Sequence, residues 1–225
     1  MLNWHDIDTV LLDMDGTLLD LSFDNYFWLN HLPEKYAQHV DISVAQASAQ
    51  LETMSIDLQG SLNWYCVDYW SDKLDIDIEA LKYELRHKIK FRPYTTEFLI
   101  HLKQLKKEII LVTNAHPKSL NVKVNTSGLN NHINRMVSSH EFLLAKENPG
   151  FWHKLEDREN IDLSRCLFID DSVAVLQRAH DEGVAHTVQV LQPDMQRAPA
   201  EPGDFLSILH FDELMRSSSL GKTNG

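Results

Sequence analysis

Cysteine, glycine and proline are scarce in this chain of 225 residues, which contains 2 Cys, 8 Gly and 7 Pro. Cys66 and Cys166 lie far apart in the sequence, so a disulfide framework is not expected and a reducing compartment is favoured. The low glycine and proline content excludes a collagen-like or disordered chain. No apolar run approaches the roughly 20 residues that span a bilayer, and the first residues do not resemble a signal peptide. These absences predict a soluble, cytoplasmic, globular protein.

Positive charge is also in short supply, because 21 Lys and Arg stand against 33 Asp and Glu, giving a formal net charge of −12. No cluster of basic residues offsets this balance locally. A nucleic-acid backbone or an anionic membrane would therefore be repelled, and we expect neither as a partner. The composition leaves open whether the chain is a monomer or a homodimer.

Short apolar runs alternate with amphipathic stretches along most of the chain. The runs are typical of strands buried on both faces of a sheet, and they cover residues 9–13, 109–113, 135–138, 166–170 and 186–191. Between them, one apolar stripe at helical spacing covers residues 98–105, and another starts at Val173 and stops before Gly183. This alternation predicts an α/β fold with a doubly wound, mainly parallel, Rossmann-like sheet.

Residues 21–91 interrupt the alternation. They contain no convincing strand, and they contain four helical segments, near residues 23–39, 43–55, 61–74 and 78–90. This stretch is too long for a simple crossover. We therefore expect an inserted helical domain, with a catalytic core formed by residues 1–20 and 92–216. Because Pro93 restricts the residue before it, hinges are expected near residues 19–21 and 92–94, while the polar tail, 217–225, is expected to be disordered.

The strongest chemical signal follows the first predicted strand and reads DMDGTLLD over residues 13–20. Asp13 and Asp15 project to the same side of an extended chain, and a turn at Gly16 leaves both at the carboxyl edge of the sheet, where ligands bind. Paired carboxylates repel one another unless a cation compensates, and Mg²⁺ suits oxygen ligands. A bare pair of this kind is usually two solvated turn residues. The full string after an apolar strand favours a magnesium site instead.

Three weaker signals follow in order. Thr113 and Asn114 end a later strand, where they can hold phosphate oxygens or simply cap a helix. Lys146 precedes a loop, as an ordinary surface lysine would. Asp170 and Asp171 end another apolar strand, where they can complete an acidic metal site or lie at a helix N-terminus.

Taken together, these motifs resemble those of the haloacid dehalogenase-like (HAD) hydrolase superfamily over essentially the whole chain, and residues 21–91 resemble its type 1 helical cap. The resemblance implies that Asp13 is the nucleophile, forming an aspartyl-phosphate, and that Asp15 is the general acid and base. It also implies that Asp13, the main-chain carbonyl of Asp15 and Asp171 bind Mg²⁺, with Asp170 binding directly or through water.

The same resemblance gives roles to the remaining motif residues. Thr113 and Asn114 would hold phosphate oxygens, and Lys146 would neutralise charge on the nucleophile and the phosphoryl group. An acid at Asp15 favours phosphoryl transfer, because dehalogenases of the superfamily lack it. The family's usual Lys-Pro is absent here, where residues 146–149 read KENP.

Aromatic residues gather in the expected insertion, at residues 23–28, 62–66 and 68–70. With the first two motifs, these strings resemble the GMP/IMP 5′-nucleotidases of bacteria within the superfamily, which implies hydrolysis of purine nucleoside monophosphates to nucleoside and phosphate. A base gains about 1–3 kcal/mol by stacking on an aromatic side chain. Trp28 and Trp64 are the candidates for stacking, and Asn25 is a candidate to read the polar edge of the base, as Asn63 and Tyr65 are. The alternative is that the aromatics pack the helical core.

Two other functions fit the same motifs. One is a phosphatase or phosphomutase for a sugar phosphate or another small phosphoester. The other is a non-catalytic module that binds phosphate and Mg²⁺ as a switch, although the complete set of nucleophile, acid and lysine argues against it. The histidines show no metal-ligand spacing, so no zinc site is expected; His116 is expected to start a helix, and Cys66 and Cys166 are expected to be core thiols.

Overall fold

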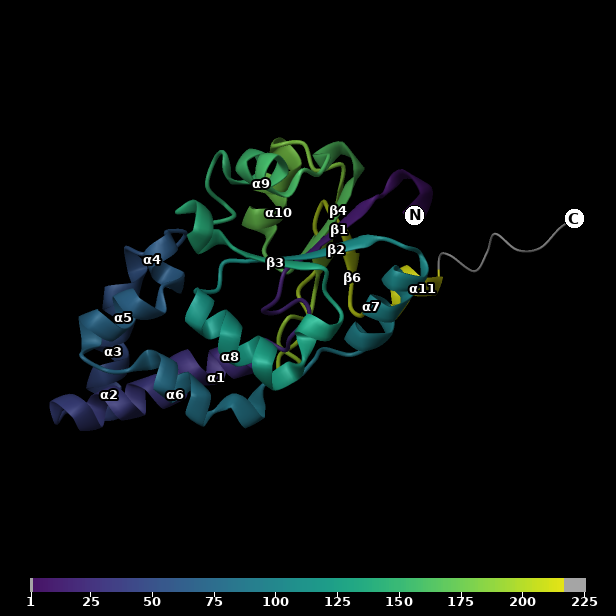
Figure 1. The fold of residues 1–225 in the computed structure, drawn as a ribbon. Helices are drawn as coiled ribbons and strands as arrows, with labels where there is room; N and C mark the ends of the chain where they lie inside the picture. Colours follow the sequence, from purple (N-terminus) through teal and green to yellow (C-terminus); the bar gives the residue numbers. More distant parts are fainter. Residues whose placement is uncertain (1, 217–225) are drawn as a thin grey trace, which may run out of the picture.

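Six parallel strands form one sheet in the order β3-β2-β1-β4-β5-β6 (Figure 1). The computed structural model describes residues 2–216. The strands are β1 (Thr9–Leu12), β2 (Glu108–Thr113), β3 (Arg135–Ser138), β4 (Cys166–Asp170), β5 (His186–Val190) and β6 (Leu206–Ile208). The predicted doubly wound α/β fold is confirmed. The sequence did not predict β6. This strand has three residues and only one of them is buried, so it lacks the apolar run that identified the other strands.

Helices cover both faces of the sheet because its strands are apolar on both sides. Val10 and Leu12 of β1 belong to a core shared with α7 and α11, whereas Leu11 belongs to a second core shared with α9 and α10. Figure 1 shows α9 and α10 on one side of the sheet and α7, α8 and α11 on the other. These helices are α7 (Thr95–Gln104), α8 (Pro117–Ser127), α9 (Phe151–Glu159), α10 (Val173–Asp181) and α11 (Asp212–Arg216). Short 3₁₀ turns occur at η1 (Trp4–Asp6), η4 (Leu129–Asn131), η5 (Ser139–Phe142) and η6 (Leu163–Arg165).

The region between β1 and β2 is helical, and we call its helices α1–α6 the helical insertion (Figure 1). It comprises α1 (Ser22–Tyr26), a π-helical turn η2 (Phe27–His31), α2 (Leu32–Val40), α3 (Val44–Ile56), α4 (Leu62–Tyr65), α5 (Val67–Leu74), α6 (Ile78–Glu84) and a 3₁₀ turn η3 (Arg86–Lys88). The insertion has a hydrophobic core of its own, built around Phe27, Trp70 and Ile78. The insertion therefore buries most of its apolar side chains in this core, which is separate from the two cores that flank the sheet.

Cys66 breaks the third predicted helical segment into α4 and α5. Its backbone is extended, and its sulfur accepts a hydrogen bond from the amide of Tyr69 in the first turn of α5. The expectation of a core thiol is wrong for Cys66, which is half-buried because it lies at this break, whereas Cys166 is fully buried as expected.

Two antiparallel chain segments connect the insertion to the sheet. The Asp20 amide donates to the Lys90 carbonyl at 2.9 Å, and the Arg92 amide donates to the Leu18 carbonyl at 3.0 Å. The Arg92 guanidinium is buried and donates to three carbonyl groups, those of Thr17, Gln192 and Leu209. The connection is thus pinned where the chain leaves and re-enters the sheet domain.

No helix within residues 2–216 combines the length and the hydrophobicity that crossing a bilayer requires. The predicted disordered tail, 217–225, lies outside the described residues.

Candidate active site

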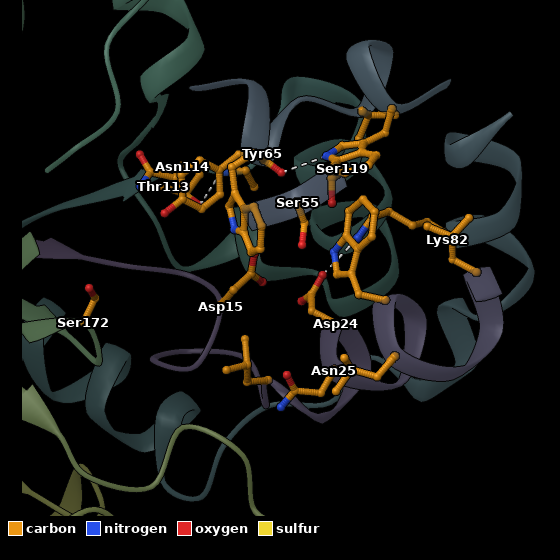
Figure 2. Close-up of a pocket in the computed structure, with 18 of the residues that line it drawn as sticks. Asp15, Asp24, Asn25, Ser55, Tyr65, Lys82, Thr113, Asn114, Ser119 and Ser172 are labelled. Carbon is orange, nitrogen blue, oxygen red and sulfur yellow. Dashed lines mark hydrogen bonds and ion pairs between the residues drawn. The ribbon is translucent and has the colours of Figure 1, made fainter. Parts of the chain in front are cut away.

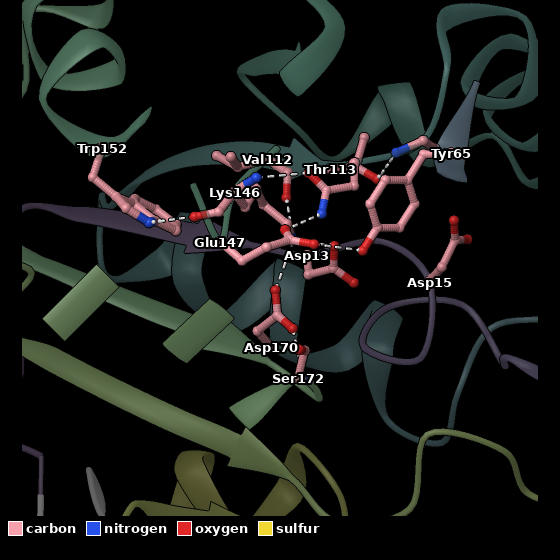
Figure 3. A network of polar contacts seen from close by, with 12 residues as sticks. Asp13, Asp15, Tyr65, Val112, Thr113, Lys146, Glu147, Trp152, Asp170 and Ser172 are labelled. Atoms are coloured by element: carbon pink, nitrogen blue, oxygen red, sulfur yellow. Dashed lines mark hydrogen bonds and ion pairs between the residues drawn. The ribbon is translucent and has the colours of Figure 1, made fainter. Parts of the chain in front are cut away.

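The carboxyl ends of three neighbouring strands bring the predicted motifs together (Figure 3). Asp13 follows β1, Thr113 ends β2 and Asp170 ends β4, and all three are buried. β1 lies between β2 and β4 in the sheet, so these side chains meet at one edge. In open α/β sheets ligands bind at this edge, where the strand order reverses.

Lys146 connects these strand ends. Its Nζ lies 2.5 Å from Oδ1 of Asp13 and 2.6 Å from Oδ2 of Asp170, and it donates to the Val112 carbonyl at 3.1 Å. The lysine is 2% exposed, so it is not the surface residue that a single lysine before a loop usually is. An ammonium group between two buried carboxylates offsets part of their mutual repulsion.

Asp13, Asp170 and Asp171 place carboxylate oxygens within 4.8 Å of one another. Burial raises the pKa of Asp13 to about 7. The negative charge of Asp170 also raises this pKa, whereas the positive charge of Lys146 lowers it. Burial and the charges of its two acidic neighbours raise the pKa of Asp171 well above its usual range. A divalent cation would relieve this strain, and three carboxylates form the oxygen donor set that Mg²⁺ prefers.

Gly16 leaves room for the same cluster. Its φ is +86°, and a Cβ atom built there would lie 2.8 Å from Cγ of Asp171. Any side chain at this position would collide with the acidic group, and the positive φ disfavours L-residues as well. The glycine of the motif therefore keeps the carboxylates in place.

Asp15 forms a second charge network, which reaches into the helical insertion. Figure 2 shows Asp15, Asp24 and Lys82, which all line the cavity. Lys123 of α8 places Nζ 2.7 Å from Oδ1 of Asp15 and 2.6 Å from Oδ2 of Asp24 in α1. Lys82 of α6 approaches the other oxygen of Asp24 at 2.9 Å. Burial raises the pKa of Asp15 to about 6, opposed by Lys123 and reinforced by Asp24. The Asp15 carboxyl group can therefore both donate and accept a proton near neutral pH.

Sequence reasoning missed Asp24, Lys82 and Lys123. Charged residues on amphipathic helices are ordinarily solvated, and nothing local distinguishes these three. The available signal is positional, because Lys123 lies one turn after Ser119 and between Val122 and Val124, on the buried side of α8.

The Thr113–Asn114 turn is held by its own side chains. The Thr113 hydroxyl accepts a hydrogen bond from the Ala115 amide at 3.0 Å. The Asn114 amide donates to Glu147 at 2.8 Å, and its oxygen accepts from the Lys146 amide at 2.9 Å. Asn114 thereby fixes the loop that carries the buried lysine.

Glu147 stands where the family pattern has proline, and it joins the two parts of the molecule. It accepts a hydrogen bond from the Tyr65 hydroxyl of α4 at 2.9 Å, in addition to the bond from Asn114 (Figure 3). A proline could make neither contact. The departure from the family motif thus creates a link between the helical insertion and the strand-edge loops.

A cavity of about 740 Å³ lies between the sheet edge and the helical insertion. Most of the site residues expected from the sequence line it: Asp13, Asp15, Asn25, Trp28, Trp64, Tyr65, Thr113, Asn114, Lys146, Asp170 and Asp171. Asn63 is the exception, because its side chain is exposed and does not line the cavity. Trp28 packs against Trp70 with ring centroids 5.6 Å apart. The amide of Asn25 donates to Asp194 at 2.7 Å, so one of its donors is already engaged. The cavity is thus lined both by the carboxylates and Lys146 of the strand edge and by aromatic rings of the helical insertion.

The haloacid dehalogenase-like hydrolase family matches this chain over residues 7–180. The chain belongs to that family. Two curated relatives carry the name GMP/IMP nucleotidase YrfG, one from Escherichia coli (strain K12) and one from Shigella flexneri. Each is 43% identical over 191 residues, which are 85% of this chain and 86% of the relative.

Solved structures of HAD proteins share the fold. An HAD phosphatase from Thermococcus onnurineus matches with a TM-score of 0.78 and 20% identity, over 95% of this chain and 98% of that one. The L-2-haloacid dehalogenase from Xanthobacter autotrophicus matches with a TM-score of 0.64 and 15% identity, over 96% of this chain and 100% of that one. At these identities the likeness concerns the fold and not the substrate.

Proposed function

We propose that this HAD hydrolase is a phosphatase that converts the purine nucleoside monophosphates GMP and IMP to nucleoside and phosphate. One observation carries the proposal: the phosphoryl-transfer residues and the tryptophans Trp28 and Trp64 line one and the same cavity. The 43% identity to proteins named GMP/IMP nucleotidase, over most of both chains, supports the same substrate class.

Asp13 acts as the nucleophile in this proposal. Its carboxylate attacks phosphorus in line with the leaving 5′-oxygen, forming an aspartyl-phosphate that water then hydrolyses. Asp15 donates a proton to the leaving oxygen and then, as the carboxylate, removes a proton from the attacking water. Its pKa near 6 suits both steps. Lys146, 2.5 Å from Asp13, offsets the charge that accumulates around the phosphoryl group.

Asp13, Asp170, Asp171 and the main-chain carbonyl of Asp15 would hold a Mg²⁺ ion. The ion would supply positive charge that orients the phosphate and balances its oxygens during transfer. Thr113 and Asn114 would hold phosphate oxygens, Asn114 through its main chain because its side-chain amide is already bound to Glu147 and Lys146. Positive groups at the site thus allow a chain of strongly negative net charge to bind a dianion.

The helical insertion would act as a cap, with residues 21–91 as the cap domain and residues 1–20 and 92–216 as the catalytic core. Trp28 and Trp64 would stack on the base, and Asn25 would read its polar edge. The links from the insertion to the core, through Asp24 to Lys123 and through Tyr65 to Glu147, would form when the cap closes and excludes bulk water.

A panel of phosphate esters tests the proposal. With Mg²⁺ present, release of inorganic phosphate should be faster, by kcat/KM, from GMP and IMP than from pyrimidine nucleotides and sugar phosphates. EDTA should stop the reaction and added Mg²⁺ should restore it. A preference for sugar phosphates would favour the alternative of a sugar-phosphate phosphatase. Absence of turnover on every ester would favour the non-catalytic module that binds phosphate and Mg²⁺.

A further inference from the structure

A second group of potential metal ligands lies where the helical insertion meets the core. Cys66, His116 and His140 each offer one ligand atom, and these atoms all lie within 4.8 Å of one another. Cys66 comes from the break between α4 and α5, His116 from the start of α8 and His140 from η5. Because the three residues are distant in sequence, ligand spacing did not reveal them.

The two imidazole rings already have an arrangement close to that of ligands on one ion. Their centroids are 4.8 Å apart and their planes cross at 87°. Two imidazoles bound through nitrogen at about 2.0–2.1 Å to a tetrahedral Zn²⁺ place their ring centres about 5 Å apart. Small rotations of the three side chains would bring the sulfur and nitrogens to bonding distance.

His140 gives an independent sign of a missing partner. Its Nε2 is buried and has no hydrogen-bond partner. A neutral imidazole with its lone pair on this nitrogen is the form of histidine that binds a metal, so a cation is a partner that suits the buried Nε2. A buried polar atom without a partner is uncommon in a folded protein.

Asp68 supplies the carboxylate that usually accompanies a metal-bound histidine. Its Oδ2 lies 3.7 Å from Nε2 of His116, and its Oδ1 lies 2.7 Å from Nζ of Lys118. If Asp68 closed to hydrogen-bond distance it would orient the imidazole and strengthen it as a ligand. The ligand atom would then be Nδ1 of His116, which accepts the Lys118 amide at 3.4 Å, and metal binding would replace that weak helix cap. Asp68 also neutralises the nearby lysine, which would otherwise repel a cation.

We propose that Cys66, His116 and His140 form a binding site for Zn²⁺ or a similar thiophilic divalent ion, separate from the acidic cluster at Asp13. On binding, the Cys66 thiol releases its proton to solvent, and the thiolate and two neutral imidazoles become ligands, with the fourth position open to water. The acidic cluster offers oxygen atoms alone, which suit Mg²⁺, whereas sulfur and imidazole select zinc.

Binding at this site would link the helical insertion to the core, because Cys66 belongs to the insertion and both histidines belong to the core. The ion would therefore favour the closed arrangement around the cavity and slow each release of product. This consequence makes the site a negative regulator of turnover that responds to zinc.

Cobalt is the probe for the site, since Co²⁺ replaces Zn²⁺ and absorbs light when a thiolate binds it. The holoprotein is first saturated with Mg²⁺ and then titrated with Co²⁺. We expect one thiolate-to-cobalt charge-transfer signal per chain, which Zn²⁺ displaces. The signal should vanish in Cys66→Ser and His140→Gln, and Asp68→Asn should weaken binding by about tenfold. The exposed His153→Gln should bind as the wild type does.

Two further measurements separate the site from the fold of a variant. In the wild-type protein, Zn²⁺ should protect Cys66 from alkylation, with buried Cys166 as the internal reference. Zn²⁺ should also lower kcat on an aryl phosphate in excess Mg²⁺, and Cys66→Ser should remove that part of the inhibition. Cobalt binding without a thiolate signal, or unprotected Cys66, would overturn the site. Binding with unchanged turnover would overturn its regulatory role.

Discussion

Replacing Lys123 with methionine tests the link between the acid–base residue and the helical insertion. The change keeps the length of the side chain and removes the charge that lies 2.7 Å from Asp15 and 2.6 Å from Asp24. Asp24 keeps Lys82 as a partner at 2.9 Å, whereas Asp15 loses the cation that opposes its burial. The variant therefore perturbs the acid–base residue more than the rest of the network.

The size of the effect follows from Coulomb's law. At an effective dielectric constant of about 20, two unit charges 2.7 Å apart attract by about 6 kcal/mol. Water that enters the cavity in the variant offsets part of the lost attraction. Each ~1.4 kcal/mol of attraction that is not offset raises the pKa of Asp15 by one unit. Losing a cation destabilises the carboxylate, so the pKa of Asp15 must rise, from about 6 to about 7 or higher. The free energy of unfolding should also fall, by up to about 3–5 kcal/mol for a broken buried pair.

The assay is the dependence of kcat on pH. In the proposed mechanism Asp15 must be ionised to activate water. Saturating Mg²⁺ keeps Asp13 ionised, although burial raises the pKa of that carboxyl group to about 7. With Mg²⁺ saturating, the acidic limb of the profile should therefore move to higher pH by at least about one unit in Lys123→Met. Lys118→Met is the matched control, because Lys118 lies on the same helix but is exposed and pairs with Asp68. An acidic limb at the same pH in both variants and the wild type would refute this account of Asp15.

Four further substitutions address the rest of the site. Asp13→Asn should reduce turnover of an aryl phosphate by at least about 10³-fold while leaving the circular dichroism spectrum unchanged, and retained activity would exclude a covalent intermediate at this residue. Gly16→Ala should abolish Mg²⁺-dependent activity and lower stability by more than about 1 kcal/mol, because the new Cβ meets the Asp171 carboxyl group at 2.8 Å; calorimetry with Mg²⁺ would show unchanged binding if this is wrong. Trp28→Ala and Trp64→Ala should raise KM for GMP more than for the aryl phosphate, and equal increases would indicate packing roles instead.

The sheet and the acidic centre could be predicted because both depend on local patterns. An apolar run that ends in a polar residue specifies a strand and also the edge at which its last side chain lies. Asp13, Thr113 and Asp170 each follow this rule, so their meeting followed from the strand order alone. The short strand β6 could not be predicted, because it is defined by its pairing with β5 and not by its own apolar pattern.

Contacts between the helical insertion and the core could not be predicted in this way. Asp24 and Lys82 are 58 residues apart, and Asp24 and Lys123 are 99 apart, on helices whose relative placement no local pattern determines. For the same reason, the sequence could not predict that Cys66 lies close to His116 and His140. Interactions across a boundary between two separately packed cores depend on how the cores dock, which is a property of the whole chain.

The paired segments around Arg92 have an evolutionary consequence. The chain departs from the sheet and returns to it at adjacent points, where the Asp20 amide meets the Lys90 carbonyl and the guanidinium grips three carbonyl groups. A different insertion between those points would leave the paired segments in place, because none of these contacts involves a residue of α1–α6. Exchange of the insertion is limited at Asp24, whose contact with Lys123 ties the surroundings of Asp15 to this part of the chain.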